Sequence, residues 1–252
     1  MTWTRHEPYE TYVGRWSRRL APIFLDRLPA AAGAAWCDVG CGSGALAHTI
    51  IDRREPALVL GVDPSPGFLR GAALRHDRRF AVVVGTAGAI PAASGQFDRV
   101  VSALALNFVP DPEQALREMR RVCRPGAVIG AYVWDYTDGM EFMRLFWEAA
   151  AALDPEAPGE DFPICRPGPL RALFGTAQLK DVEVAPIETL TVFPDFDAFW
   201  QPFLGGAGVA PAYVASLPED HRERLRERLR ATLPGGVIEL TARAWAVTGR
   251  AE

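Results

Sequence analysis

Three glycines alternate with other residues at Gly40, Gly42 and Gly44, and an aspartate stands on each side of them. Glycine adopts positive φ readily and lets a ligand approach the backbone closely. Asp38 lies two residues before the first glycine, and Asp63 lies 19 residues after the last. A carboxylate in the place of Asp63 can accept hydrogen bonds from both hydroxyls of a ribose. The pattern favours a loop that holds a nucleoside, although a tight strand-to-helix turn would need the same glycines.

The spacing of the glycines separates two classes of nucleoside ligand. Dinucleotide sites prefer G-x-G-x-x-G, in which the helix N-terminus meets a pyrophosphate. Here the spacing is G-x-G-x-G, and Asp38 adds a carboxylate close to the loop. A negative charge in that place suits a cationic ligand better than a pyrophosphate.

Short apolar runs alternate with helical patterns over residues 36–134, and this alternation must position the loop. Apolar runs occur at 36–40, 57–63, 79–85, 97–108 and 125–134. Such runs, separated by helices, indicate a parallel sheet with helices on both faces. Ligands bind such a doubly wound sheet beyond the carboxyl ends of its strands, where the glycine loop falls.

The second half of the chain has a different pattern. A helix is expected at 141–153, followed by an exposed Pro/Gly-rich loop at 154–169. The alternating runs at 179–193 and 237–250 predict a strand pair near a sheet edge. Between them lie an aromatic segment, 193–206, which favours a core role over a pocket, and a charged helix, 218–233.

Composition excludes several classes of protein. The 252 residues are 49% hydrophobic and 23% charged, as in a globular chain. The net charge of −4 disfavours nucleic acid as a partner. No apolar run predicts a membrane span, and the N-terminus lacks a signal-peptide pattern, so a cytoplasmic protein is expected. The four cysteines have no metal-site spacing and are expected as reduced, partly buried thiols.

The motifs "WCDVGCGSGALA", "VLGVDPSPGFL" and "GTAGAIPAASGQFDRVVSALALNFVPDPEQALREMRRVCRPGAVI" occur in that order along the chain. Together they resemble a class I S-adenosylmethionine-dependent methyltransferase. The resemblance implies an α/β fold with a doubly wound, Rossmann-like sheet of seven strands, mostly parallel with an antiparallel last strand. It also implies one domain over 1–252: a helical cover at 1–33, a cofactor-binding core at 34–135, and C-terminal strands with substrate-cap insertions at 136–252.

The resemblance carries cofactor-binding roles onto matching positions of this chain. The glycines would line the methionine and ribose portion, and Asp38 would support the positively charged amino group. Asp63 would take the ribose hydroxyls. Thr86 departs from the family pattern, because a hydroxyl replaces the usual carboxylate that faces the adenine. The full expected set is Arg15, Trp16, Asp38, Gly40, Gly42, Gly44, Asp63, Pro64, Thr86, Ala87, Ala103 and Leu104.

Candidate acceptor-side residues follow the fourth and fifth predicted strands. Asn107 follows the fourth strand without the prolines of an Asn-Pro-Pro-aromatic run, which argues against adenine in DNA as the acceptor. Asp135 and Tyr136 follow the fifth and could act as a base or orient a hydroxyl; the alternative for them is an ordinary strand-end turn. Arg15 and Trp16 could close over the cofactor, or lie on a solvated amphipathic helix.

The sequence thus predicts a methyltransferase that uses S-adenosyl-L-methionine on a small-molecule acceptor and has no metal site. Three alternatives stay open: a non-catalytic cofactor-binding module of the same fold, an NAD-dependent oxidoreductase, and an RNA methyltransferase. The acceptor atom and the oligomeric state do not follow from the sequence.

Overall fold

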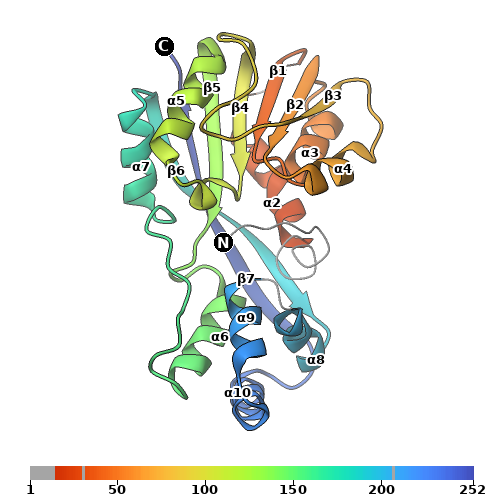
Figure 1. The fold of residues 1–252 in the computed structure, drawn as a ribbon, viewed down its shortest axis with the longest axis vertical. Coiled ribbons are helices and arrows are strands. Elements are labelled where there is room, and N and C mark those ends of the chain that lie inside the picture. Colours follow the sequence, from red (N-terminus) through yellow and green to blue (C-terminus); the bar gives the residue numbers. More distant parts are fainter. Residues whose placement is uncertain (1–14, 30–31, 206–207) are drawn as a thin grey trace.

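The computed structural model describes residues 15–29, 32–205 and 208–252. Seven strands form one sheet in the order β3-β2-β1-β4-β5-β7-β6 (Figure 1). The strands are β1 (Ala35–Val39), β2 (Leu58–Asp63), β3 (Phe80–Val84), β4 (Phe97–Ala103), β5 (Cys123–Trp134), β6 (Lys180–Phe193) and β7 (Ile238–Arg250). The pairings from β3 to β5 are parallel, and β7 is antiparallel to both of its neighbours. The predicted fold class is confirmed.

Helices cover both faces of the sheet, as the near-continuous apolar strands require. Helices α2 (Arg15–Leu25) and α3 (Ala45–Arg53) pack on one face, and α5 (Pro112–Val122) and α7 (Pro167–Thr176) pack on the other. Helix α4 (Pro66–Ala73) follows β2, and the short 3-10 helix η2 (Leu106–Phe108) follows β4. The central strands are therefore buried on both sides, and the chain crosses from strand to helix at their carboxyl ends.

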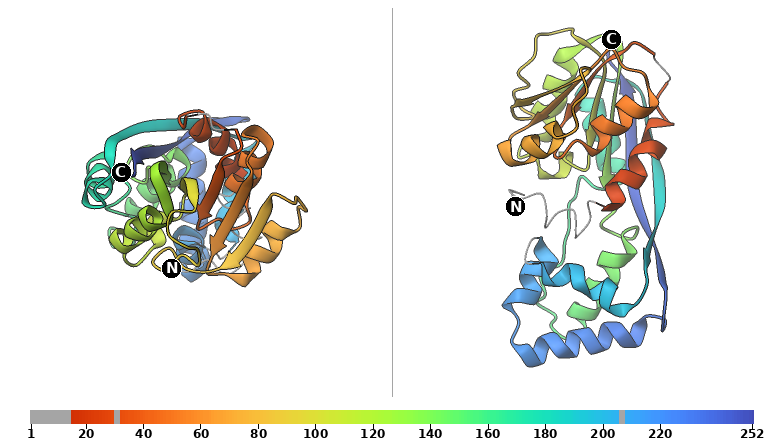
Figure 2. Two further views of the ribbon diagram at one scale, coloured as in Figure 1. Left: turned by 90° about the horizontal axis from the view of Figure 1, so that it is seen from above. Right: turned by 90° about the vertical axis from the view of Figure 1, so that its right-hand side faces the viewer.

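Strands β6 and β7 are long and reach well beyond the rest of the sheet (Figures 1 and 2). A group of helices gathers around their far ends, which we call the helical lobe. It comprises α6 (Glu141–Ala151), α8 (Phe196–Trp200), η3 (Gln201–Leu204), α9 (Val209–Ser216) and α10 (Glu219–Thr232).

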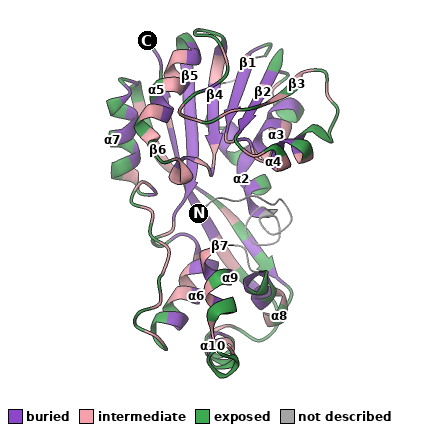
Figure 3. Cartoon of the chain, viewed as in Figure 1, coloured by how far each residue is buried: buried purple, intermediate pink, exposed green. Residues whose placement is uncertain are grey.

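Stacked aromatic rings form the core of the helical lobe. The helices of the lobe carry both buried and exposed positions (Figure 3). The ring of Phe203 stacks on Phe146 and on Phe142, with centroids 4.3 and 4.5 Å apart. Phe199 and Trp200 are also buried, as expected for the aromatic segment. Phe196 is half-buried, and the Arg230 guanidinium lies 4.6 Å from its ring centroid. This segment therefore fills the lobe core.

Two helices lie where the sequence predicted none. Helix α7 begins at Pro167, at the end of the expected 154–169 loop, because proline suits the first helical turn. Helix α9 lies in the short apolar stretch after the aromatic segment. No helix within the described ranges is long and apolar enough to cross a membrane.

Candidate functional site

The glycine loop joins β1 to α3, and backbone geometry explains two of its glycines. Gly40 has φ +74°, and a Cβ there would lie 2.5 Å from the Cβ of Ala105, in the loop after β4. Gly42 has φ +53°, and a Cβ there would meet no atom within 4 Å. Gly40 therefore lets two loops at the sheet edge approach each other, whereas Gly42 leaves open space in front of the backbone.

Asp38 is a fully buried carboxylate on β1, directly before this loop. Neither of its oxygens has a hydrogen-bond partner. Burial raises the pKa of Asp38 to about 7; the Ala47 backbone N–H partly opposes this rise, and the negative charge of Asp63 adds to it. The Ala47 N–H influences the carboxylate without the geometry of a hydrogen bond. A buried carboxylate without a partner is costly, so a ligand that brings a cation or hydrogen-bond donors would stabilise this site.

Asp63 ends β2 and faces the same loop. One oxygen accepts from the Gly42 N–H at 2.9 Å, and the other accepts from the Ser65 N–H at 2.8 Å. Burial raises the pKa of Asp63 above its ordinary value, while these two backbone bonds hold it lower. Pro64 lies between the two partners, and the Ser65 hydroxyl caps α4 by accepting from the Phe68 N–H. Asp63 therefore joins the glycine loop to the start of α4.

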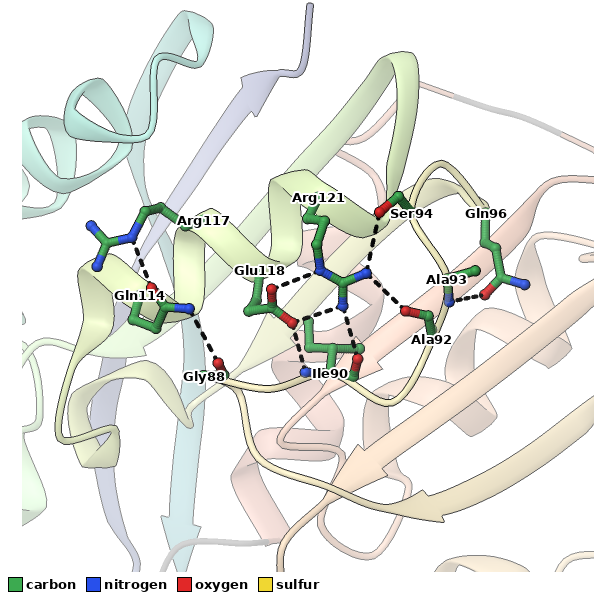
Figure 4. A network of polar contacts seen from close by, with 10 residues as sticks. All are labelled: Gly88, Ile90, Ala92, Ala93, Ser94, Gln96, Gln114, Arg117, Glu118 and Arg121. Atoms are coloured by element: carbon green, nitrogen blue, oxygen red, sulfur yellow. Dashed lines mark hydrogen bonds and ion pairs between the residues drawn. The ribbon is translucent and has the colours of Figure 1, made fainter.

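The loop that holds Thr86 and Ala87 is fastened to α5 by a polar network (Figure 4). Glu118 accepts from the Ile90 N–H at 2.9 Å and pairs with Arg121. Arg121 donates to the carbonyls of Ile90 and Ala92, each at 2.9 Å. Thr86 is exposed and Ala87 is half-buried. Their predicted adenine contact stays a prediction. The network holds their loop in position against α5.

Replacing Arg121 by alanine is expected to weaken S-adenosylhomocysteine binding several-fold, because the loop loses its two carbonyl contacts and Glu118 loses its cation. Arg120→Ala is the matched control, since Arg120 lies on the same helix and donates to Ala177 and Gln178 after α7, not to this loop. Calorimetric titration measures both. Equal affinities of the two variants for S-adenosylhomocysteine would show that the network does not contribute to cofactor binding.

The loop after β4 brings further predicted residues to the same edge. Ala103 ends β4, and Leu104 has φ +56° and donates its N–H to the Tyr132 carbonyl at 2.8 Å. This left-handed turn directs the chain into η2, which holds Asn107 and Phe108. The Asn107 Nδ2 is buried and has no hydrogen-bond partner. It is a free donor beside the proposed reaction centre, and its catalytic assignment stays a prediction.

Asp135 is buried and fully engaged by protein groups. Arg243 donates to Oδ2 from Nε at 2.7 Å and from Nη2 at 2.6 Å. The N–H groups of Thr137 and Asp138 donate to Oδ1. This arrangement favours a structural role that holds the turn after β5 against β7. The proposed role as a base stays untested.

Tyr136 and Trp16 lie in different surroundings. Tyr136 is half-buried, and its ring centroid lies 4.7 Å from that of Phe162. Trp16 is 2% exposed, and its ring contacts Phe142 and Phe193, at 5.1 and 5.8 Å. Trp16 thus joins α2 to the aromatic core of the helical lobe. The side chain of Arg15 lies outside the described residues.

The sequence did not identify three residues of this region as functional candidates. Phe162 and Glu160 lie in an irregular segment, and Arg243 lies in a strand 108 residues from its partner Asp135. The alternating pattern of 237–250 predicts a strand that contains Arg243, but nothing in the sequence indicates that Asp135 is its partner.

Other chemistries find little support in the described part of the chain. No group of histidine, cysteine and acidic side chains there could hold a metal ion. The four cysteines are buried and free, as expected. Burial is the first cause that raises the pKa of each thiol, to about 12 for Cys123 and Cys165. They are therefore poor nucleophiles near neutral pH.

Residues 37–130 match the family described as "Methyltransferase domain". Among curated relatives, the malonyl-[acyl-carrier protein] O-methyltransferase of Enterobacter lignolyticus is 32% identical over 145 residues, which cover 58% of this chain and 56% of that one. The chain spans about half the length of the curated relatives it matches.

Solved structures share the fold at low identity. A candidate type II methyltransferase of Anaeromyxobacter dehalogenans has a TM-score of 0.67 at 22% identity and covers 99% of this chain and 98% of that one. Phosphoethanolamine N-methyltransferase 2 of Haemonchus contortus, in complex with phosphomonomethylethanolamine and S-adenosylhomocysteine, has a TM-score of 0.59 at 16% identity and covers 96% and 56%.

The matched domain contains β1 to β4, α5 and most of β5, and the glycine loop, Asp38 and Asp63 all lie inside it. The sheet order and the single antiparallel strand agree with the fold of these neighbours. The chain therefore contains a methyltransferase domain, and its domain and fold are consistent with a class I S-adenosylmethionine-dependent methyltransferase.

Proposed function

We propose that this protein transfers a methyl group from S-adenosyl-L-methionine to a small-molecule acceptor. The observation that carries the proposal is Asp38, a fully buried carboxylate with no partner for either oxygen beside the open backbone at Gly42. A cationic amino group near Asp38 would satisfy this charge. A pyrophosphate there would add repulsion, which disfavours the oxidoreductase alternative.

The described residues fit this cofactor in three places. Gly42 leaves room in front of the loop, and Asp38 offers its carboxylate to an ammonium. Asp63 already stands at the end of β2 with its carboxylate oriented by two backbone N–H groups. Each carboxylate oxygen has a second lone pair, so it can also accept from a ribose hydroxyl.

When bound, S-adenosylmethionine supplies a methyl group on a positively charged sulfur, which is the reactive chemistry. The residues of this chain would orient the ligands and exclude water. The turn after β4 approaches the glycine loop, because Ala105 faces Gly40, and it leads into the η2 helix. Asn107 and Tyr136 stand on the acceptor side, after β4 and β5.

The relatives differ in what their names say they methylate. One acts on a malonyl-acyl-carrier-protein oxygen, and the structure of another contains phosphomonomethylethanolamine. The names of these relatives therefore do not identify the acceptor of this chain.

Calorimetric titration with S-adenosylmethionine, S-adenosylhomocysteine and NAD tests the proposal. We expect both sulfur compounds to bind and NAD not to bind. Binding of NAD with no binding of either sulfur compound would contradict it. Cofactor binding with no transfer in a broad acceptor screen would favour the non-catalytic module instead.

A further inference from the structure

The segment of residues 154–166 connects the helical lobe to the sheet side of the molecule, running from α6 to α7 (Figure 1). Its Phe162 ring lies 5.6 Å from Phe108 and 4.7 Å from Tyr136, between centroids. Phe108 ends η2 after β4, and Tyr136 follows β5, so the three rings meet at the carboxyl edge of the sheet. We call Phe108, Tyr136 and Phe162 the aromatic cluster.

The aromatic cluster differs from the ring core of the helical lobe in its exposure. All three of its residues are half-buried, whereas Phe142, Phe146, Phe199 and Phe203 in the lobe core are fully buried. A half-buried ring at the ligand edge of a doubly wound sheet lies where ligands of this fold bind. Asn107, beside Phe108, adds its buried and unpartnered Nδ2.

Glu160 lies two residues before Phe162, so their Cα atoms are at most about 7.6 Å apart. Glu160 is half-buried, and its Oε1 is buried and has no hydrogen-bond partner. The backbone N–H of Ala210, in the first turn of α9, is the one polar group whose effect on this carboxyl is resolved, and burial raises the pKa of Glu160 to about 7. No arginine, lysine or histidine within the described ranges pairs with it. A buried carboxylate oxygen without a hydrogen-bond partner is costly unless a ligand compensates.

Resting on the proposed function, we propose that Glu160 and the aromatic cluster form the acceptor subsite, and that the acceptor is an amine carried on an apolar or aromatic group. An ammonium satisfies a buried carboxylate through a charge-assisted hydrogen bond. The faces of aromatic rings attract the same cation, and their area accommodates the apolar part of the molecule.

The same carboxylate has a second use for an amine acceptor. An ammonium has no free lone pair, so it must lose a proton before its nitrogen can form a new bond. The N–H proton passes to the Glu160 carboxylate, which becomes neutral, and the lone pair stays on nitrogen. An anionic acceptor would instead bring a second negative charge beside Glu160, which is unfavourable in a desolvated site.

Binding measurements test this without turnover. The protein, saturated with S-adenosylhomocysteine, is titrated with benzylamine, 2-phenylethylamine and 3-phenylpropylamine, and with the three matching alcohols. We expect at least one amine to bind about tenfold or more tightly than its alcohol. The Glu160→Gln variant is expected to lose that preference, because the amide keeps the shape and removes the charge.

Glu156→Gln is the matched control, since Glu156 lies exposed on the same segment; it should keep the wild-type preference. The proposal is overturned if no amine binds better than its alcohol, or if Glu160→Gln keeps the preference. The wild-type comparison needs no variant, so a poorly folding Glu160→Gln protein would not remove the test. Failure of S-adenosylhomocysteine to bind in the preliminary titration would instead overturn the proposed function itself.

Discussion

An Asp63→Ala protein is expected to bind S-adenosylhomocysteine about 100-fold more weakly than the wild type, as follows from losing hydrogen bonds to a charged group. The carboxylate accepts from the N–H groups of Gly42 and Ser65, and these bonds hold the glycine loop next to the start of α4. Alanine would remove the proposed ribose contact and would release the loop. Calorimetric titration at neutral pH measures the loss.

Two further variants separate the causes. Asp52→Ala is the matched control, because Asp52 is an exposed aspartate that pairs only with Arg75, on the outer side of α3. Asp63→Asn keeps one acceptor oxygen, so we expect an intermediate affinity. If Asp63→Ala binds S-adenosylhomocysteine as tightly as the wild type, the ribose assignment is wrong.

Asp38 is expected to make the ligand-free protein less stable as the pH rises from about 4 to about 7. Its pKa is about 7 in the folded protein and 3.8 as the ordinary value, so the folded state keeps a proton that the unfolded state has lost. The free energy of unfolding therefore falls across this range, by about 4 kcal/mol in total. Below pH 4 the carboxyl is neutral in both states and this contribution vanishes.

Comparison with an Asp38→Asn protein isolates this effect. Urea unfolding at pH 5 and pH 8 should show a smaller loss of stability in the variant than in the wild type. Carboxyls that do not interact with Asp38 titrate alike in both proteins and cancel in the difference. If the free energy of unfolding changes equally with pH in the two proteins, Asp38 does not destabilise the folded state at high pH.

The cofactor should stabilise the wild type more than it stabilises the Asp38→Asn protein. A positively charged amino group near Asp38 stabilises the ionised carboxylate, so saturating S-adenosylhomocysteine should raise the unfolding midpoint of the wild type at pH 8 more than that of Asp38→Asn. Equal shifts would place the amino group elsewhere.

Much of the sheet half was predictable because its signals are local. Each apolar run from β1 to β5 except that of β3 is followed by its own helix pattern, and the strand pair β6 and β7 shows period-two alternation along each strand. Helices α7 and α9 escaped prediction because proline and glycine surround them, and those residues signal turns as readily as helix starts.

The sequence by itself determined the fold class, the glycine loop and the two aspartates beside it, because strand period, backbone freedom and residue order are properties of short stretches. The tertiary structure alone decided the environment of each charge. It left both Asp38 oxygens and the Glu160 Oε1 buried without a hydrogen-bond partner, while it gave Asp135 an arginine 108 residues away. Burial and pairing depend on contacts between distant segments, and no local pattern specifies which of several carboxylates will find a partner.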